Sequence, residues 1–172
     1  MGIDERRRKE ELLASLYEEY YDKIARYIYV RLGNQAVAED LAGESFLKAL
    51  ESLDSYRERG IPMQAWLFKI AHNQMVDYLR KASKQKTVPL DKMELPDRVN
   101  IEETVERQSE LERLSKALEQ LTPAQREVIG LRFFAGLTST EVGEILGKNS
   151  GSVREMQSAA VKSLRKLMLN ES

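Results

Sequence analysis

Few side chains in this 172-residue sequence are of the types that carry out covalent chemistry. The absence of cysteine excludes disulfides, thiolate metal sites and cysteine nucleophiles, and a single histidine, His72, excludes paired-histidine catalysis. His72 and Asp77 are five residues apart in a predicted helix, about 140° apart around its axis, so they should not form an acid–base pair. We expect His72 on the helix surface. With no paired carboxylates and no glycine-rich phosphate loop, the sequence predicts no enzyme, no metal site and no cofactor.

Binding chemistry is better represented, first in the middle of the chain. Lys69, Asn73 and Arg80 share one face of a predicted helix, next to a loop that starts at Tyr56 and with Trp66 at the edge of the face. An aromatic plane, a cation and an amide are what an unstacked nucleic-acid base requires of its partner. The competing interpretation is that both aromatic residues belong to the core, and we favour it for Trp66.

A second candidate lies near the C-terminus. A short helix predicted over 138–146, a tight turn and a longer helix form a helix-turn-helix pattern, whose second helix would enter a DNA major groove. Arg154 could read guanine or hold a phosphate, and Glu155 could accept from cytosine or orient Arg154. Lys148 and a helix N-terminus capped by Ser150 suit a phosphate. An ordinary helical hairpin would give the same pattern, so the motif alone leaves both interpretations open.

The elements that must hold these residues are helical. Apolar side chains recur at three- and four-residue steps over residues 12–28, and Gly33 and Asn34 are suited to end this helix and cap the next. A third helix is expected from Pro62, in its first position, to about Lys81.

The second half of the chain repeats this helical pattern after an interruption. Periodicity fails from residue 83 to about 100, where Pro89 and Pro96 indicate a linker. Four helical segments follow, two of them started by capping boxes at 122–125 and 138–141. Alternating strand patterns are absent from the sequence, which therefore predicts an all-α fold.

Charge is balanced overall and uneven locally. The 27 basic and 28 acidic residues give a net charge of −1, which does not indicate a strongly basic nucleic-acid binder. Residues 57–82 and 148–172 each carry five basic and two acidic side chains, net +3, and flank residues 101–121 with net −3. No apolar run approaches the roughly 20 residues of a membrane span, and the N-terminus lacks the apolar stretch of a signal peptide. We expect a cytoplasmic protein without membrane insertion.

Three blocks of sequence together carry a family resemblance. They are AEDLAGESFLKAL (38–50), WLFKIAHNQMVDYLRK (66–81) and LTPAQREVIGLRFFAGLTSTEVGEILGKNSGSVREMQSAAVKSLRKL (121–167). In this order and spacing they resemble the extracytoplasmic-function sigma factors, which are bacterial RNA polymerase specificity subunits. The resemblance implies two small helical domains: a region 2-like bundle over 1–82, a linker over 83–102 and a region 4-like helix-turn-helix domain over 103–172.

The resemblance also implies roles for particular residues. Recognition and melting of the promoter −10 element would fall to Tyr56, Arg57, Lys69, Asn73, Asp77 and Arg80. The −35 element would be read by Lys148, Ser150, Ser152, Arg154, Glu155, Ser158 and Lys162. Docking on the polymerase would use Asp40, Leu41, Glu44 and Phe46. The implied partners are core RNA polymerase, promoter DNA and an anti-sigma factor.

Three other functions compete with this one. A stand-alone helix-turn-helix regulator would bind duplex DNA strongly as a dimer, but the linker and the face around Asn73 argue against it. A helical adaptor that binds only protein would make Arg154 and Asn73 irrelevant to promoter output. A helical enzyme would need a catalytic constellation that the sequence does not offer.

Overall fold

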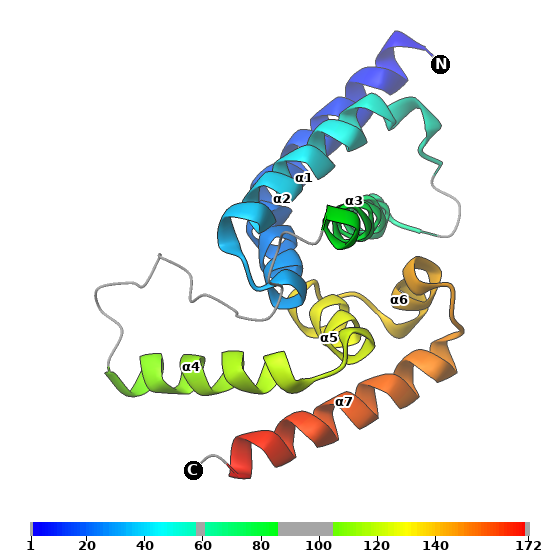
Figure 1. The fold of residues 1–172 in the computed structure, drawn as a ribbon. Coiled ribbons are helices and arrows are strands. Elements are labelled where there is room, and N and C mark those ends of the chain that lie inside the picture. The colour runs from blue at the N-terminus through cyan, green and yellow to red at the C-terminus, as the bar shows by residue number, and fades with distance from the viewer. Residues whose placement is uncertain (1, 58–60, 86–104, 171–172) are drawn as a thin grey trace.

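The computed structural model describes residues 2–57, 61–85 and 105–170, and all regular structure within these ranges is helical (Figure 1). The all-α prediction is therefore confirmed. In chain order the elements are α1 (Ile3–Leu32), α2 (Gln35–Glu51), the short 3-10 turn η1 (Leu53–Ser55), α3 (Met63–Gln85), α4 (Val105–Gln120), α5 (Pro123–Ile129), the π-turn η2 (Gly130–Phe134), α6 (Ser139–Leu146) and α7 (Ser150–Asn170).

The N-terminal half is a hairpin of α1 and α2 with α3 packed against it (Figure 1). The reversal between the first two helices follows the predicted chemistry. Gly33 adopts the left-handed conformation, with φ 77°, and its N–H donates to the Tyr29 carbonyl at 2.7 Å. The side chain of Asn34 then accepts from the Val37 N–H at 3.1 Å and so caps α2.

The start and end of α3 differ slightly from the prediction. Pro62 lies just before the helix rather than in its first position, and its carbonyl accepts the first helical hydrogen bond, from Trp66, at 3.1 Å. The helix continues to Gln85 instead of ending near Lys81, and Ala82 in its last turn is buried, which the polar composition of this stretch did not reveal.

The C-terminal half places α7 across α5 and α6, with α4 alongside (Figure 1). Both predicted capping boxes are present: the side chains of Thr122 and Thr138 accept from the third residue of their helices, and Gln125 and Glu141 reciprocate. The cap of α7 was wrongly predicted. Asn149, not Ser150, provides it, because the Asn149 carboxamide accepts from the Ser152 N–H at 2.7 Å.

One apolar cluster runs through both halves. Tyr27 and Phe68, from α1 and α3, belong to the same buried cluster as Leu137 and Val142 from the C-terminal half. The approach is close at Gly130, where a Cβ atom would lie 2.9 Å from the Tyr27 ring. The halves are thus packed together here, while the predicted domain limits of 1–82 and 103–172 stay predictions. The predicted linker, 83–102, lies largely outside the described residues.

The helix-turn-helix turn should be intolerant of a side chain at Gly143. This residue is buried in α6, its carbonyl accepts from the Lys148 N–H at 2.9 Å, and an added Cβ would overlap the Lys148 carbonyl. We expect Gly143→Ala to lower the free energy of unfolding by at least about 2 kcal/mol in urea titrations. Gly43→Ala is the matched control, since open space surrounds Gly43 inside α2, and it should stabilise by up to about 1 kcal/mol. Equal effects of the two substitutions would contradict this account of the turn.

Candidate nucleic-acid interface

The C-terminal half carries a shallow basic cleft of about 670 Å³. Four cations line it: Arg132 from η2 and, from α7, Arg154, Lys162 and Arg165. The remaining lining residues are neutral, namely Ser139, Gln157, Ser158 and Val161. A cleft with this lining attracts an anionic chain and offers it hydrogen-bond donors.

Helical periodicity explains the wall that α7 forms. Arg154, Ser158, Lys162 and Arg165 follow one another at steps of four, four and three residues, which keeps them on one face of the helix. The opposite face of α7 buries Val153 and Ala160 against the rest of the domain.

Arg132 fixes one corner of this cleft. Its Nε donates to Gln157 Oε1 at 2.8 Å, and its Nη1 donates to the Leu137 carbonyl. The guanidinium therefore ties η2 to α7. Because the carboxamide oxygen of Gln157 is occupied by Arg132, its NH2 group is the part left to donate to a ligand.

The structure brings together only part of the residues predicted for −35 recognition. Arg154, Ser158 and Lys162 line the cleft. Ser150, Ser152 and Glu155 lie in the first turns of α7 and Lys148 in the turn before it, all outside the cleft lining. Lys148 and Glu155 are exposed there. Sequence reasoning missed Arg132, Ser139, Gln157 and Arg165. The helical repeat of α7 could have identified Arg165, but no sequence signal placed Arg132 beside this helix.

A second polar face lies on α3. Lys69, Asn73 and Arg80 are exposed on it, as predicted from the sequence. Asp77 pairs with Arg80 and, at 3.2 Å, with Lys81, and these hydrogen bonds, that of Lys81 foremost, lower the pKa of the Asp77 carboxyl below its usual range. Asp77 thus neutralises part of the positive charge and holds Arg80 in place.

The aromatic pair beside this face is mostly buried. Tyr56 is 5% exposed, its hydroxyl donates to the Ile61 carbonyl at 3.2 Å, and its ring centroid lies 5.1 Å from that of Trp66. Trp66 is partly buried against the core, in line with the favoured interpretation. Arg57 is exposed and donates to the Asp54 carbonyl at 2.7 Å. In this arrangement Arg57 is available to a ligand and the Tyr56 ring is not.

The residues predicted to dock on polymerase divide in the same way. Asp40 and Glu44 are exposed, one turn apart on α2. Leu41 and Phe46 are buried, and the Phe46 ring packs edge-on against Tyr17 at 4.9 Å between ring centroids.

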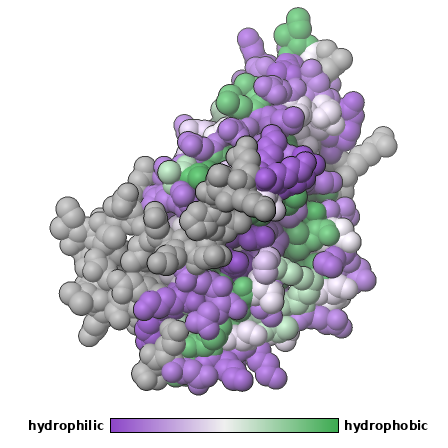
Figure 2. Space-filling view, viewed as in Figure 1, coloured by the Kyte–Doolittle hydropathy of each residue, from purple (hydrophilic) through white to green (hydrophobic). Residues whose placement is uncertain are grey.

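The view in Figure 2 shows hydrophilic side chains over much of the coloured surface, broken by separate hydrophobic patches.

His72 does not lie on an open helix surface, so that prediction was wrong. Its Nδ1 is 2.9 Å from Oε1 of Glu127 in α5 and 3.1 Å from the hydroxyl of Tyr27 in α1. The Tyr27 hydroxyl donates to the same carboxylate, and Arg31 Nε lies 3.6 Å from its other oxygen. Burial, reinforced by the charge of Glu127, raises the pKa of Tyr27 well above its usual range. The cluster joins the two halves and does not pair His72 with Asp77.

Within residues 2–57, 61–85 and 105–170, no group of three or more histidine, aspartate or glutamate side chains lies close enough to hold a metal ion. None of the helices in this part of the chain combines the length and apolar character that a membrane crossing needs.

Comparisons with known proteins identify both halves. The family model for Sigma-70 region 2 matches residues 16–85, and the model for Sigma-70, region 4 matches residues 117–166. The chain is 30% identical over 159 residues to RNA polymerase sigma factor YlaC of Bacillus subtilis, covering 91% of each chain. It is 36% identical over 162 residues to ECF RNA polymerase sigma factor BldN of Streptomyces coelicolor, covering 91% of this chain but only 60% of BldN.

Solved structures share the fold across both halves. The sigma factor RpoE from Bartonella quintana, in complex with the anti-sigma factor NepR, superposes with a TM-score of 0.75 at 24% identity, covering 90% of this chain and 95% of RpoE. CnrH in complex with the cytosolic domain of CnrY gives a TM-score of 0.69 at 22% identity, covering 95% and 91%.

The buried Tyr27 hydroxyl should make stability fall at alkaline pH. Its pKa is raised in the folded chain, so the folded state holds this proton more tightly, and the stability it confers is complete below the ordinary tyrosine value of about 10 and is lost as pH rises above it. Tyr27→Phe should cost about 1–3 kcal/mol at pH 7, because Glu127 loses a donor, and the deficit should shrink above pH 10. Urea midpoints from pH 7 to 11 measure this. Tyr17→Phe, at an exposed ring, is the control, and a constant deficit for Tyr27→Phe would refute the linkage.

Proposed function

This chain belongs to the extracytoplasmic-function RNA polymerase sigma factors, and from that premise we propose that it directs core polymerase to promoters with −35 and −10 elements and helps to open them. Sigma factors are transcription initiation factors, and we propose no enzymatic activity for this one. It would act in the cytoplasm, where core polymerase and promoter DNA are found.

The basic cleft beside the helix-turn-helix is the observation that carries the proposal. Four cations and the Gln157 amide face the same hollow, and α7 is the second helix of the motif. We assign this surface to the −35 element, with Arg132 and Arg165 added to the predicted set. Lys148, Ser150, Ser152 and Glu155, at the N-terminal end of α7, would meet base edges and the nearest phosphates.

The polar face of α3 is the proposed −10 surface. Lys69, Asn73 and Arg80 are exposed on it, and Arg57 is exposed at the base of the adjoining loop. A cation beside an amide suits a single strand, whose phosphates and base edges are both accessible. While its ring is buried, Tyr56 would not contact DNA itself and would instead shape the base of the loop.

Two separate DNA surfaces explain how a chain of net charge −1 could bind a promoter. Each surface makes too few phosphate contacts to bind DNA strongly alone. Joined through polymerase, the two would bind as one, because the first contact raises the effective concentration of the second. We therefore propose one domain within 1–82 and another within 103–172, with 83–102 as the tether.

Protein partners complete the proposal. Asp40 and Glu44 offer exposed carboxylates to core polymerase, with Leu41 and Phe46 supporting α2 from the core. RpoE was solved in complex with the anti-sigma factor NepR, and CnrH in complex with the cytosolic domain of CnrY. We propose by analogy that an anti-sigma factor controls this chain.

Transcription with purified components tests the function. Bacterial core polymerase is incubated with and without this protein on genomic fragments that include the region upstream of its own gene. Specific transcripts that need the protein support the proposal, and their start sites locate the −35 and −10 sequences. Binding to duplex DNA without core, with no binding to core itself, would favour a stand-alone regulator. Binding to neither would refute both.

The cleft residues should show the salt signature of phosphate contacts. Arg165→Ala removes a lining cation, while Lys166→Ala removes an exposed cation next to it that does not line the cleft. We expect Arg165→Ala to weaken promoter binding by the holoenzyme by roughly 1 kcal/mol and to reduce the slope of log K against log salt by about 1. Lys166→Ala should behave as wild type. Equal losses of promoter affinity in the two variants would show that binding depends only on the net charge of the chain.

A further inference from the structure

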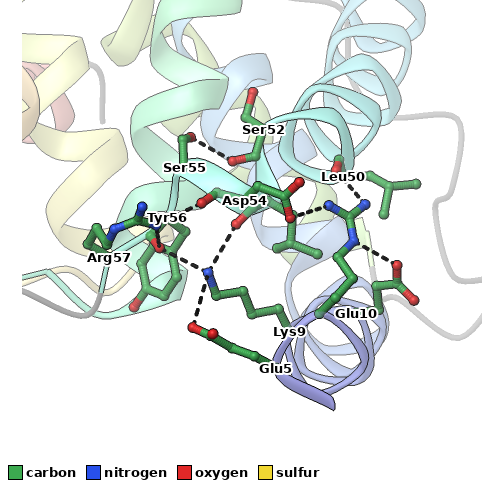
Figure 3. Close-up of polar contacts among 11 residues, drawn as sticks. Glu5, Lys9, Glu10, Leu50, Ser52, Asp54, Ser55, Tyr56 and Arg57 are labelled. Carbon is green, nitrogen blue, oxygen red and sulfur yellow. Dashed lines mark hydrogen bonds and ion pairs between the residues drawn. The ribbon is translucent and has the colours of Figure 1, made fainter. Parts of the chain in front are cut away.

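The first turns of α1 make a set of contacts that neither the sequence patterns nor the proposed function explains. Arg6 and Lys9 are three residues apart and so share one face of the helix. Both reach the segment 50–57, which connects α2 to the loop beside the −10 surface (Figure 3). These residues also precede the part of the chain that the region 2 family model matches.

Lys9 is bound to the backbone at the first residue of η1 and just after its end. Its Nζ donates to the Leu53 carbonyl at 3.4 Å and to the Tyr56 carbonyl at 3.1 Å, and Glu5 lies 4.0 Å away. The side chain is only 14% exposed. A lysine ammonium has three donors, and a buried one needs partners, so these carbonyls are held where the ammonium can reach them.

Arg6 holds the start of the same segment. Its Nη1 donates to Asp54 at 2.6 Å, its Nη2 reaches the Leu50 carbonyl at 3.5 Å, and its Nε donates to Glu10 at 2.8 Å. Leu50 lies in the last turn of α2, where carbonyls lack helical partners and a cation is favourable. The hydrogen bond from Arg6 lowers the pKa of the Asp54 carboxyl below its usual range.

The Lys9 contact reaches Tyr56, the residue before Arg57, and the Arg6 contact reaches Asp54 two residues earlier. The Tyr56 carbonyl accepts from Lys9 and also from Arg57 Nη1, at 3.1 Å each, while the Tyr56 ring contacts Trp66. The backbone of Tyr56 is thus held from α1, and its side chain is held from α3. Arg57 follows directly, and its guanidinium turns back onto the Asp54 and Tyr56 carbonyls (Figure 3).

We propose that Arg6 and Lys9 are positioning residues, which hold the base of the loop at Tyr56 and Arg57 in the orientation that promoter opening requires. We call the contacts of Arg6 and Lys9 with residues 50–56 the α1 clamp. Its consequence for promoter opening rests on the proposed function, whereas the contacts themselves do not. Without the ammonium, the Leu53 carbonyl keeps the Tyr56 N–H and the Tyr56 carbonyl keeps Arg57 as donors, but the link from this segment to Lys9 of α1 is lost and the packing of the Tyr56 ring on Trp66 loosens.

Trp66 provides a direct readout because it is the chain's single tryptophan. Lys9→Met keeps the aliphatic stem and removes the donors, so the helix packing is retained. In this variant we expect the fluorescence emission of Trp66 to shift to longer wavelength and its quenching by acrylamide to increase. Opening of a supercoiled promoter, followed by permanganate reactivity at the −10 element, should slow at least about tenfold, with core binding unchanged.

Matched variants separate positioning from general effects. Arg8→Met removes an exposed cation from the same turn and should match wild type in both readouts. Lys9→Arg restores a donor and should recover most of the opening rate. Should Lys9→Met fail to give a native circular dichroism spectrum, Arg6→Lys, which keeps the charge and loses the fork of donors, tests the same clamp with a smaller expected change.

The outcomes discriminate clearly. Lys9→Met indistinguishable from Arg8→Met would overturn the proposal. A changed Trp66 signal with unchanged opening would also overturn it, because the contact would then be merely structural. If the wild-type protein supports no transcription, the proposed function fails, while the fluorescence comparison still decides whether the clamp exists.

Discussion

A buried carboxylate, that of Glu127, holds this molecule in one arrangement. A carboxylate removed from water needs polar partners in fixed positions, and Glu127 finds them on two other helices. The Tyr27 hydroxyl of α1 donates to it, Arg31 Nε of α1 lies 3.6 Å away, and His72 Nδ1 of α3 lies 2.9 Å away. Together with the apolar cluster that spans both halves, these polar contacts fix the C-terminal half against the N-terminal half, and with it the place of the basic cleft relative to the polar face of α3.

Features with local causes could be predicted from the sequence. Asn34, Thr122 and Thr138 cap helices because each side chain bonds to backbone three residues away, so the sequence neighbourhood contains the whole interaction. The apolar face of α3 was predicted from its periodicity for the same reason. The family resemblance added the order of the two halves, which is the part of the fold that periodicity cannot supply.

Features with distant causes could not be predicted. His72 lies on the polar face of its own helix. Its position is part of an interface only because it contacts Glu127, which is 55 residues later in the sequence. Lys9 reads as one of several charges on an exposed helix, although its ammonium is bound to carbonyls more than 40 residues away. For Tyr56 the sequence left base stacking and a core position both open; tertiary packing buries its ring, and its role at the −10 element stays a prediction. In each case the environment of the side chain depends on a partner that is distant in the sequence, so the residue type alone does not predict it.

The length of the α7 face that lines the cleft has a consequence for how DNA would meet it. The eleven helical steps from Arg154 to Arg165 advance about 16 Å along the helix axis, the length over which duplex DNA stacks about five base pairs. The cations therefore form a row rather than a cluster, and a row follows the direction of one strand. A ligand with a single phosphate could use only one end of it, so the cleft favours polymers over mononucleotides by its length alone.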